Sequence, residues 1–413
     1  MKIKNFATVV NGATPSTEHP EYYDGQIIWV TPKDLSDQNA KYIWHGERNI
    51  TEKGFQRCST KILPRGSVLM SSRAPIGLLA IAANPCCTNQ GIKGFDIDTS
   101  ICNPEYLYYY LRYHIKEIES LGSGTTFKEV SKESMQEYDV ILPNIDEQNG
   151  IVSILKAIDD KIINNSAICT KLEGMAKLLY DYWFVQFDFP DENGNPYKSS
   201  GGKMVWNEEL KREIPEGWSN GCVSDLGSVV TGGTPSTEYN EYFTTDGYAW
   251  ATPKDLSLLN GRFYFHGATD ITEAGLKNSA CNLMPEGSIL FTTRAPIGYI
   301  AITANPACTN QGFKSVVPLP EYGTEFVFQT MKTLVPQMQR VGVGSTFKEV
   351  SKDVFSSQAV VLPKKKILES YGKKTQVIQE ILKSIQQKNS RLVSLRDFLL
   401  PMLMNGQVKV KGA

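Results

Sequence analysis

Two long segments of the chain share one spacing of hydrophobic positions. In residues 146–185 and 366–405, apolar side chains recur three, four or seven positions apart, which is the spacing of an amphipathic α-helix. Almost forty helical residues at ~1.5 Å each would make a rod about 55–60 Å long. One small domain cannot cover the apolar side of such a rod. We therefore expect the two helices to pack on each other, as in a coiled coil.

The apolar stripes also predict which side chains lie between the two helices. The predicted contact residues are Ile158, Ile168, Leu172 and Leu179 in the first helix and Leu382, Leu392, Leu395 and Leu399 in the second. Asn165 and Asn389 interrupt the two stripes at comparable depths. A polar Asn between paired helices can set their register, and an Asn at the exposed edge of a stripe fits the pattern equally well.

The rest of the chain is patterned as short strands and short helices. The β-like runs, bounded by Gly and Pro, are residues 26–30, 67–70, 78–82 and 140–143. Residues 106–118 have a helical pattern behind Asn103 and Pro104, which suit a cap and a first helical turn. Another short helix begins near Ser131. Because no regular βαβ alternation is present, the pattern predicts an α+β fold.

Each long helix follows one of two copies of the same domain. The repeated blocks are TPSTE (14–18 and 234–238), WVTPKDL and WATPKDL (29–35 and 250–256), RAPIG (73–77 and 294–298), TNQG (88–91 and 309–312) and TFKEVSK (126–132 and 346–352). Each pair is offset by 220 or 221 residues. A period this long indicates a duplicated domain, because the units of repeat solenoids run to about 20–50 residues. The predicted order is a first copy (1–145), a helix (146–185), a turn-rich linker (186–217), a second copy (218–365), a second helix (366–405) and a tail (406–413).

Composition places the chain among ordinary soluble proteins. It has 413 residues, of which 41% are hydrophobic and 21% charged, and no apolar run approaches the roughly 18–20 residues that span a membrane. The first residues are too polar for a signal peptide, and the eight cysteines show no CxxC spacing. We therefore expect a cytoplasmic protein with reduced thiols. The net charge of −1 does not exclude a nucleic-acid partner, since local patches decide such binding.

The sequence offers no convincing catalytic or metal site. Residues 103–106 (NPEY) resemble the Asn-Pro-Pro-Tyr motif of adenine methyltransferases, but Glu105 replaces the second proline and no glycine-rich loop precedes it. We therefore interpret Asn103 as a helix cap. The glycine-rich loops at 122–128 and 342–348 lack the spacing of a phosphate-binding loop. His45 and His266 occupy matching positions without an acidic or cysteine cluster, which favours a structural role.

What the two copies share instead is a set of side chains suited to contacting DNA. The candidates are Lys33, Arg73, Asn89, Gln90, Thr125, Thr126 and Lys128 in the first copy, and Lys254, Arg294, Asn310, Gln311, Ser345, Thr346 and Lys348 in the second. Arg and Lys pair with guanine edges or phosphates, and Asn and Gln pair with adenine. A structural role inside each copy explains the repetition equally well, and a tight turn explains the two glycine-rich loops equally well.

Taken together, these motifs resemble the specificity subunit of Type I restriction–modification systems. The resemblance covers the whole chain. It rests on the repeated blocks, on GATP (12–15) and GGTP (232–235), on WFVQFDFP (183–190), on the linker 196–218 and on LRDFLLPMLMNGQV (395–408).

The resemblance implies an α+β protein with two target recognition domains and a long helix after each, the helices pairing as an antiparallel coiled-coil spacer. Each domain would bind one half of a bipartite double-stranded DNA target. Two methyltransferase subunits and the restriction subunits would dock on the chain. The chain itself would be non-catalytic and hold no cofactor or metal, because S-adenosylmethionine, ATP and Mg would belong to its partners. The alternative is a non-catalytic coiled-coil scaffold that binds proteins.

The close likeness of the two copies adds a hypothesis about the target. About half of the positions in residues 28–94 are identical to their counterparts in residues 249–315. Similar domains would read similar bases, so we expect two similar half-sites in a nearly palindromic, interrupted target. We also expect that inserting four residues near Asn165 lengthens the gap between half-sites without changing the bases that are read.

Overall fold

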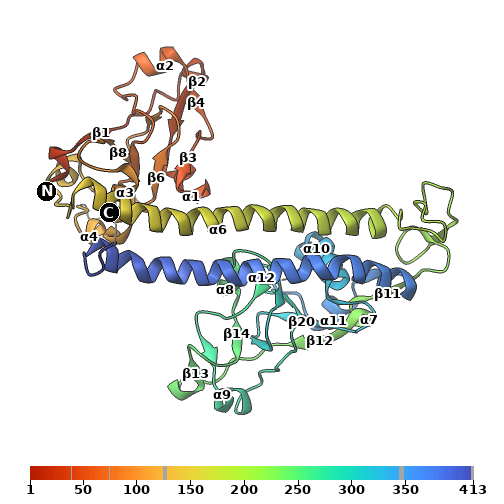
Figure 1. Cartoon of the computed structure of the whole chain (residues 1–413). Coiled ribbons are helices and arrows are strands. Elements are labelled where there is room, and N and C mark those ends of the chain that lie inside the picture. The colour runs from red at the N-terminus through yellow and green to blue at the C-terminus, as the bar shows by residue number, and fades with distance from the viewer. Residues whose placement is uncertain (39, 74, 124–127, 344–347, 411–413) are drawn as a thin grey trace. The chain divides into compact units, whose positions relative to one another are not determined.

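The computed structural model describes residues 1–38, 40–73, 75–123, 128–343 and 348–410. The chain forms two compact units, unit 1 from Met1–Ile162 with Leu392–Ala413 and unit 2 from Ile163–Arg391. Each unit contains one copy of the repeated domain and a part of each long helix (Figure 1).

Unit 1 is organised around a five-stranded sheet with the order β1-β8-β5-β6-β3. Its strands are β1 (Ala7–Asn11), β8 (Ile92–Ile97), β5 (Val68–Ser71), β6 (Leu79–Ala82) and β3 (Tyr42–Ile43). Neighbouring strands are antiparallel, except for β3 and β6, which are parallel. The central strand β5 is buried throughout because Val68 and Met70 join one hydrophobic cluster while Leu69 joins another.

Smaller elements surround this sheet. A second sheet has the order β4-β2-β7, from β4 (Asn49–Ile50), β2 (Tyr23–Val30) and β7 (Cys87–Thr88). The short helices are α1 (Pro32–Gln38), α2 (Glu52–Gln56), α3 (Pro104–Tyr113), α4 (Ile115–Ser120) and α5 (Lys132–Glu137). Asn103 caps α3 by accepting a 2.8 Å hydrogen bond from the Glu105 N–H, and Ser131 caps α5. Both caps agree with the sequence-based interpretation.

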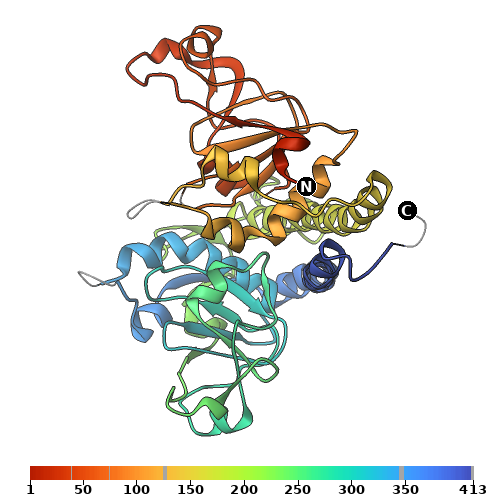
Figure 2. The same cartoon turned by 90° about the vertical axis from the view of Figure 1, so that its left-hand side faces the viewer.

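Unit 2 repeats the same architecture. Its five-stranded sheet has the order β12-β20-β17-β18-β15, from β12 (Gly227–Thr231), β20 (Lys314–Pro318), β17 (Ile289–Phe291), β18 (Ile300–Thr303) and β15 (Phe263–Tyr264). These strands occupy the positions of the unit 1 strands in the same order, and β15 and β18 are again parallel. The duplication in sequence is therefore a duplication of fold (Figures 1 and 2).

Most of the remaining elements of unit 2 also have counterparts in the first copy. The strands are β11 (Ser219–Cys222), β13 (Phe243–Thr244), β14 (Ala249–Ala251), β16 (Asp270–Ile271), β19 (Ala307–Thr309) and β21 (Ala359–Leu362). The helices are α7 (Val223–Leu226), α8 (Pro253–Ser257), α9 (Glu273–Lys277), α10 (Thr324–Val341) and α11 (Lys352–Ser356). Strand β14 pairs in parallel with β19, as β2 does with β7.

The structure differs from the sequence-based prediction in two places of the first copy. The helix predicted for residues 106–118 is two helices, α3 and α4, which meet at His114, whereas α10 is continuous in the second copy. Residues 140–143 do not form the predicted strand. There the pairing consists of a bridge between Lys2 and Asp139 and a 2.8 Å bond from the Val140 N–H to the Met1 carbonyl.

The segment predicted as a turn-rich linker is an ordered part of unit 2. It contains a hairpin of β9 (Met204–Asn207) and β10 (Arg212–Pro215). Phe187 and Phe189 are buried beside Trp218, and the rings of Phe189 and Trp218 stack with centroids 4.9 Å apart. This segment therefore contributes to the core of unit 2 instead of acting as a loose connection.

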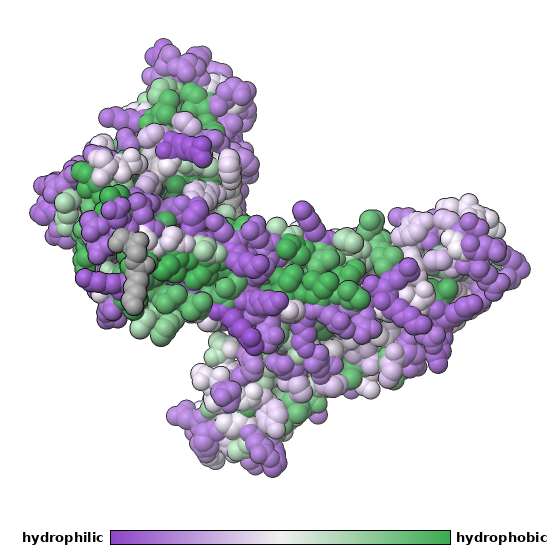
Figure 3. Space-filling view, in the orientation of Figure 1, coloured by the Kyte–Doolittle hydropathy of each residue, from purple (hydrophilic) through white to green (hydrophobic). Residues whose placement is uncertain are grey.

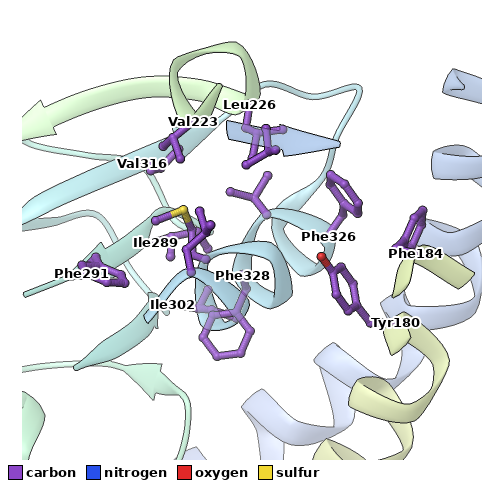
Figure 4. Packing of buried hydrophobic residues seen from close by; sticks show 14 of the residues in the cluster. Tyr180, Phe184, Val223, Leu226, Ile289, Phe291, Ile302, Val316, Phe326 and Phe328 are labelled. Carbon is purple, nitrogen blue, oxygen red and sulfur yellow. The ribbon is translucent and has the colours of Figure 1, made fainter. Parts of the chain in front are cut away.

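The two long helices have nearly the predicted bounds. Helix α6 runs over Ile145–Tyr180 and continues as a π-helical turn, Asp181–Val185, while α12 runs over Lys365–Met404. Tyr180 and Phe184 anchor the end of α6 in unit 2, where both point toward Phe326 of α10 (Figure 4).

Within unit 2 the two helices pair in antiparallel orientation. The Nδ2 of Asn165 donates to the Oδ1 of Asn389 over 2.7 Å, and the rings of Trp183 and Tyr371 lie 5.8 Å apart. Trp183 comes 18 residues after Asn165, and its partner Tyr371 comes 18 residues before Asn389, so the two helices run in opposite directions. The two asparagines lie inside the contact and pair with each other, which is the register-setting arrangement.

The side chains between the helices follow a strict alternation of three and four positions. In unit 2 this contact stripe consists of Asn165, Cys169, Leu172, Ala176 and Leu179 on α6, and of Leu368, Tyr371, Thr375, Ile378, Leu382, Ile385 and Asn389 on α12. All of them are buried or half-buried. The 3.5-residue period is that of a left-handed coiled coil.

In unit 1 the contact stripe continues through Ile158 and Leu155 on α6 and through Leu392, Arg396 and Leu399 on α12. Of the predicted contact residues, Leu382 lies in the core of unit 2. Leu172 and Leu179 pack against that core, and Leu399 packs against the core of unit 1. The assignment of Ile168 and Leu395 to the contact is wrong for this chain alone, because each is 45% exposed. The polar residues Asn165 and Arg396 take the contact positions, so these apolar neighbours face outward.

Candidate nucleic-acid interface

The repeated motifs of each copy are joined to one another by main-chain hydrogen bonds. In unit 1 the amide of Asn89 donates to Val30, that of Ser72 to Gly91 and that of Val130 to Ser72, at 2.8–3.0 Å. In unit 2 the same bonds link Asn310 to Ala251, Thr293 to Gly312 and Val350 to Thr293. Motifs far apart in sequence are therefore neighbours in each unit, and we call the exposed side chains of these motifs the motif face.

The TPKDL motif starts a short helix and presents its lysine at the surface. In α8, Thr252 is the N-cap, Pro253 occupies the first turn, and Asp255 accepts a 2.9 Å bond from the Thr252 N–H. Asp34 makes the equivalent 2.7 Å bond to the Thr31 N–H in the first copy. The Thr, Pro and Asp of this motif are thus structural, and its exposed side chain is Lys33 or Lys254.

The two lysines have different surroundings. Lys33 lies 2.7 Å from Glu47. The position equivalent to Glu47 is Ala268, and both residues place their amide N–H on the aspartate of the motif. No acidic side chain within the described part of the chain pairs with Lys254. The second copy therefore offers a cation that the first copy neutralises.

The two amide side chains of the TNQG motif have different roles: the asparagine is structural and the glutamine is exposed. The Oδ1 of Asn89 accepts from the Gly91 N–H at 3.0 Å, and that of Asn310 from the Gly312 N–H at 2.9 Å, so each asparagine closes a turn. The next residues, Gln90 and Gln311, are exposed, and each accepts a hydrogen bond from the threonine of the TPSTE motif, Thr14 or Thr234. The glutamine is therefore the better candidate for an external contact.

Each candidate arginine belongs to a cluster of one acid and two cations. The Nε of Arg73 donates to Glu129 over 2.9 Å, and the buried Lys93 lies 3.2 Å from the other oxygen of that carboxylate. In unit 2, Arg294 lies 3.0 Å and Lys314 3.7 Å from Glu349.

In the first copy the cluster favours the charged form of its carboxylate. Burial disfavours the charged form of Glu129, but the hydrogen bonds from Lys93 and Arg73 outweigh burial and lower its pKa. In the second copy, burial lowers the pKa of Lys314 despite the nearby Glu349. The sequence-based candidates omitted both glutamates. Each lies inside the repeated TFKEVSK motif, and an acid repeated between lysines in both copies could have indicated an ion-pair cluster.

The remaining candidates belong to the two glycine-rich loops. Lys128 and Lys348 are exposed, each directly before the glutamate of its cluster. Thr125, Thr126, Ser345 and Thr346 lie outside the described residues. The motif face of each unit therefore combines one lysine from TPKDL, one arginine, one glutamine and one loop lysine.

Other potential chemistry has a structural explanation. The Nδ1 of His266 lies 2.7 Å from Asp270, a buried acid that the sequence reasoning did not pair with it. Among the described residues no group of three or more His, Cys, Asp or Glu side chains is arranged to hold a metal ion. No helix in the described part of the chain is both long and apolar enough to cross a membrane.

Known proteins share this organisation. The pattern of the family described as "Type I restriction modification DNA specificity domain" matches residues 1–173 and 215–393. The MjaIX specificity subunit of Methanocaldococcus jannaschii, a Type I restriction enzyme, is 30% identical over 99% of this chain and 93% of its own. The HindI specificity subunit of Haemophilus influenzae is 26% identical over 75% of this chain and 79% of its own.

A solved structure shares the fold. The S subunit of a Type I restriction-modification system from M. genitalium aligns with a TM-score of 0.61 at 16% identity, covering 98% of this chain and 95% of that chain. With a family match in both copies and a relative that is similar over nearly the whole length, this chain belongs to the family of Type I restriction–modification specificity subunits.

Proposed function

We propose that the two motif faces read the two halves of a bipartite DNA target, one half per unit. The observation that carries this proposal is that the same motif face is built twice, with an exposed lysine, arginine, glutamine and loop lysine at equivalent positions. Such side chains serve both phosphate contacts, which position a protein on DNA, and base contacts, which specify the sequence.

We further propose that the chain directs catalytic partners and performs no chemistry itself. In this scheme S-adenosylmethionine, ATP and Mg belong to methyltransferase and restriction subunits. The roles of the suspected catalytic residues support it, because Asn103 caps α3 and Glu105 binds Lys41 at 2.7 Å and Lys156 at 2.9 Å. These residues are engaged in holding unit 1 together.

An exposed apolar stripe on α6 supports docking of the methyltransferase subunits. The stripe consists of Ile168, Met175 and Leu178 on α6 and of Tyr182 and Val185 in the π-helical turn that follows it, which are 45%, 57%, 66%, 36% and 46% exposed. It forms a hydrophobic band over the part of α6 in unit 2 (Figure 3). Its spacing of seven, three, four and three positions matches that of the contact stripe, so a helix of a partner could pack there in the same way.

The experiment that tests the proposed function is to produce the chain together with a methyltransferase subunit of its own system and to map N6-methyladenine across the host genome. We expect a two-part motif that appears only when both chains are present. A stable complex that leaves no motif would reject DNA reading and favour the alternative, a coiled-coil scaffold, which the exposed stripe on α6 also fits.

A further inference from the structure

The arginine of each motif face is held by its glutamate in a particular way. Glu129 binds Arg73 at Nε, and the main chains of the two residues form a bridge as well. Arg294 and Glu349 repeat both features. Within the described residues, neither arginine donates a hydrogen bond from its two terminal amino groups. One edge of the guanidinium is therefore occupied, while the side chain remains 49% exposed for Arg73 and 47% for Arg294.

The glutamate is itself fixed from the other side. Lys93 is only 4% exposed and Lys314 only 10%, so each buried ammonium needs the carboxylate that the arginine also uses. The cluster carries two positive charges and one negative charge, which leaves one positive charge at the surface. A buried lysine thus orients the carboxylate, and the carboxylate orients the plane of the arginine.

We propose that each Lys–Glu–Arg cluster is a guanine reader, in which Arg73 and Arg294 donate to the O6 and N7 of one guanine in each half-site. This inference rests on the proposed function. An arginine binds guanine through two coplanar N–H donors. Fixing that plane before binding helps the contact to distinguish guanine from the other bases. Holding the side chain in advance also lowers the entropy lost on binding. A phosphate contact tolerates a wider range of arginine orientations, because a phosphate offers acceptor oxygens in several directions.

The proposal assigns different roles within the cluster. Arg73 and Arg294 contact the base, whereas Glu129, Glu349, Lys93 and Lys314 are positioning residues. It follows that each half-site contains at least one G·C pair and that the two readers occupy equivalent places in their half-sites. The two half-sites then share this guanine even if their other bases differ. The unequal surroundings of Lys33 and Lys254 are one source of such a difference.

The first test is methylation mapping of the reconstituted complex with Arg73→Ala or Arg294→Ala. Each change is expected to relax one G·C position in one half-site, a different half for each variant, with a loss of discrimination on the order of 10-fold to 100-fold. Arg65→Ala is the control, because Arg65 is exposed in unit 1 outside the repeated motifs. Weaker methylation at all sites with every base preference intact would overturn the proposal in favour of a phosphate contact.

The second test leaves the protein unchanged and therefore cannot fail through misfolding. Oligonucleotides carrying the mapped target are made with 7-deazaguanine at each guanine in turn, which removes N7. We expect one position per half-site to lose affinity for the wild-type complex, and the same replacement to cost nothing further in the matching arginine variant. A half-site without a G·C pair, or equal binding of every substituted duplex, would overturn the inference while leaving the two-part motif and the proposed function intact.

The positioning role has its own variant. Combining Lys93→Met with Glu129→Gln removes the buried charge pair without leaving one partner alone. The expected result is a folded complex with reduced guanine discrimination at the same position that Arg73→Ala affects. A thermal unfolding curve establishes folding, and unchanged discrimination in the folded variant would show that the glutamate does not act through the arginine.

Discussion

Individual buried charges attach the first copy of the repeated domain to the long helices within unit 1. Asp159 on α6 accepts a 3.1 Å hydrogen bond from Arg396 on α12 and another from the hydroxyl of Tyr109 on α3. Asp159 and Arg396 are 9% and 12% exposed. Burial raises the pKa of Tyr109, and its bond to Asp159 raises it further, so the tyrosine remains a hydrogen-bond donor. Three elements of unit 1 thus meet at one carboxylate.

Removing Arg396 should destabilise unit 1 far more than removing a surface cation. Arg396→Ala leaves Asp159 buried without its counter-charge, and such a loss costs about 3–5 kcal/mol in free energy of unfolding. Lys33→Ala is the matched control, because its ion pair with Glu47 is exposed and worth about 1 kcal/mol or less. Urea unfolding measures both. Equal effects of the two changes would contradict the attachment role of Asp159.

For single residues, the sequence indicated which motifs lie together on the motif face better than it indicated the role of each side chain. The repeated blocks identified the motif face in both copies. Whether Asn89 turns the chain or faces outward depends on one hydrogen bond to Gly91, which residue types do not reveal. The pairing of Arg73 with Glu129 joins residues far apart in sequence, so only the fold brings them together.

Among the elements, the long helices were the most predictable because their apolar period is sustained over many turns. The sequence could not tell which of two neighbouring stripes on α6 faces α12. Apolarity favoured Ile168, but Asn165 and Cys169 lie in the contact because Asn165 meets Asn389 there. Residues 186–217 are predicted to be a turn-rich linker because glycine and proline recur there. Its buried aromatic residues, Phe187 and Phe189, outweigh that signal.

The exposed stripe on α6 yields a prediction about partner binding. Changing Leu178 to Lys places a charge in the middle of this apolar surface and should prevent stable association with the methyltransferase subunit. Leu258→Lys is the control, because Leu258 is 75% exposed elsewhere in unit 2. Co-purification of both variants with the partner, followed by size-exclusion chromatography, measures the effect. Normal complex formation by Leu178→Lys would place the docking site elsewhere.

For the whole molecule, the regular contact stripe changes how the gap between half-sites should be tested. Four residues inserted into one helix would break the alternation of three and four positions, whereas seven residues in both helices preserve it. Suitable sites are between Ile162 and Ile163 on α6 and between Arg391 and Leu392 on α12, where the two units join.

This double insertion adds about 10 Å of helix, which corresponds to about three base pairs at 3.4 Å each. We expect methylation mapping to return the same bases in both half-sites, separated by a longer gap. Matched insertions in an exposed loop of unit 1 serve as the control. A changed base preference with an unchanged gap would contradict a spacer role for the helices.

The duplicated fold also limits what the sequence can say about the target. The strand order is the same in both units, so their shared framework was foreseeable from the repeats. Beyond the split of α3 from α4, the copies differ in single side chains on the motif face, such as Ala268 in place of Glu47 beside the TPKDL lysine. Whether such differences change the bases that are read depends on contacts with DNA. The hypothesis of similar half-sites therefore remains a prediction.

The most direct test of the central claim is methylation mapping with one motif face altered at a time. One variant combines Gln90→Ala with Lys128→Ala, and its counterpart combines Gln311→Ala with Lys348→Ala, all at exposed positions. If each unit reads one half of the target, each variant relaxes or weakens recognition in one half only, and the two variants affect opposite halves. Loss of preference in the same half, or in both halves for either variant, would contradict the account.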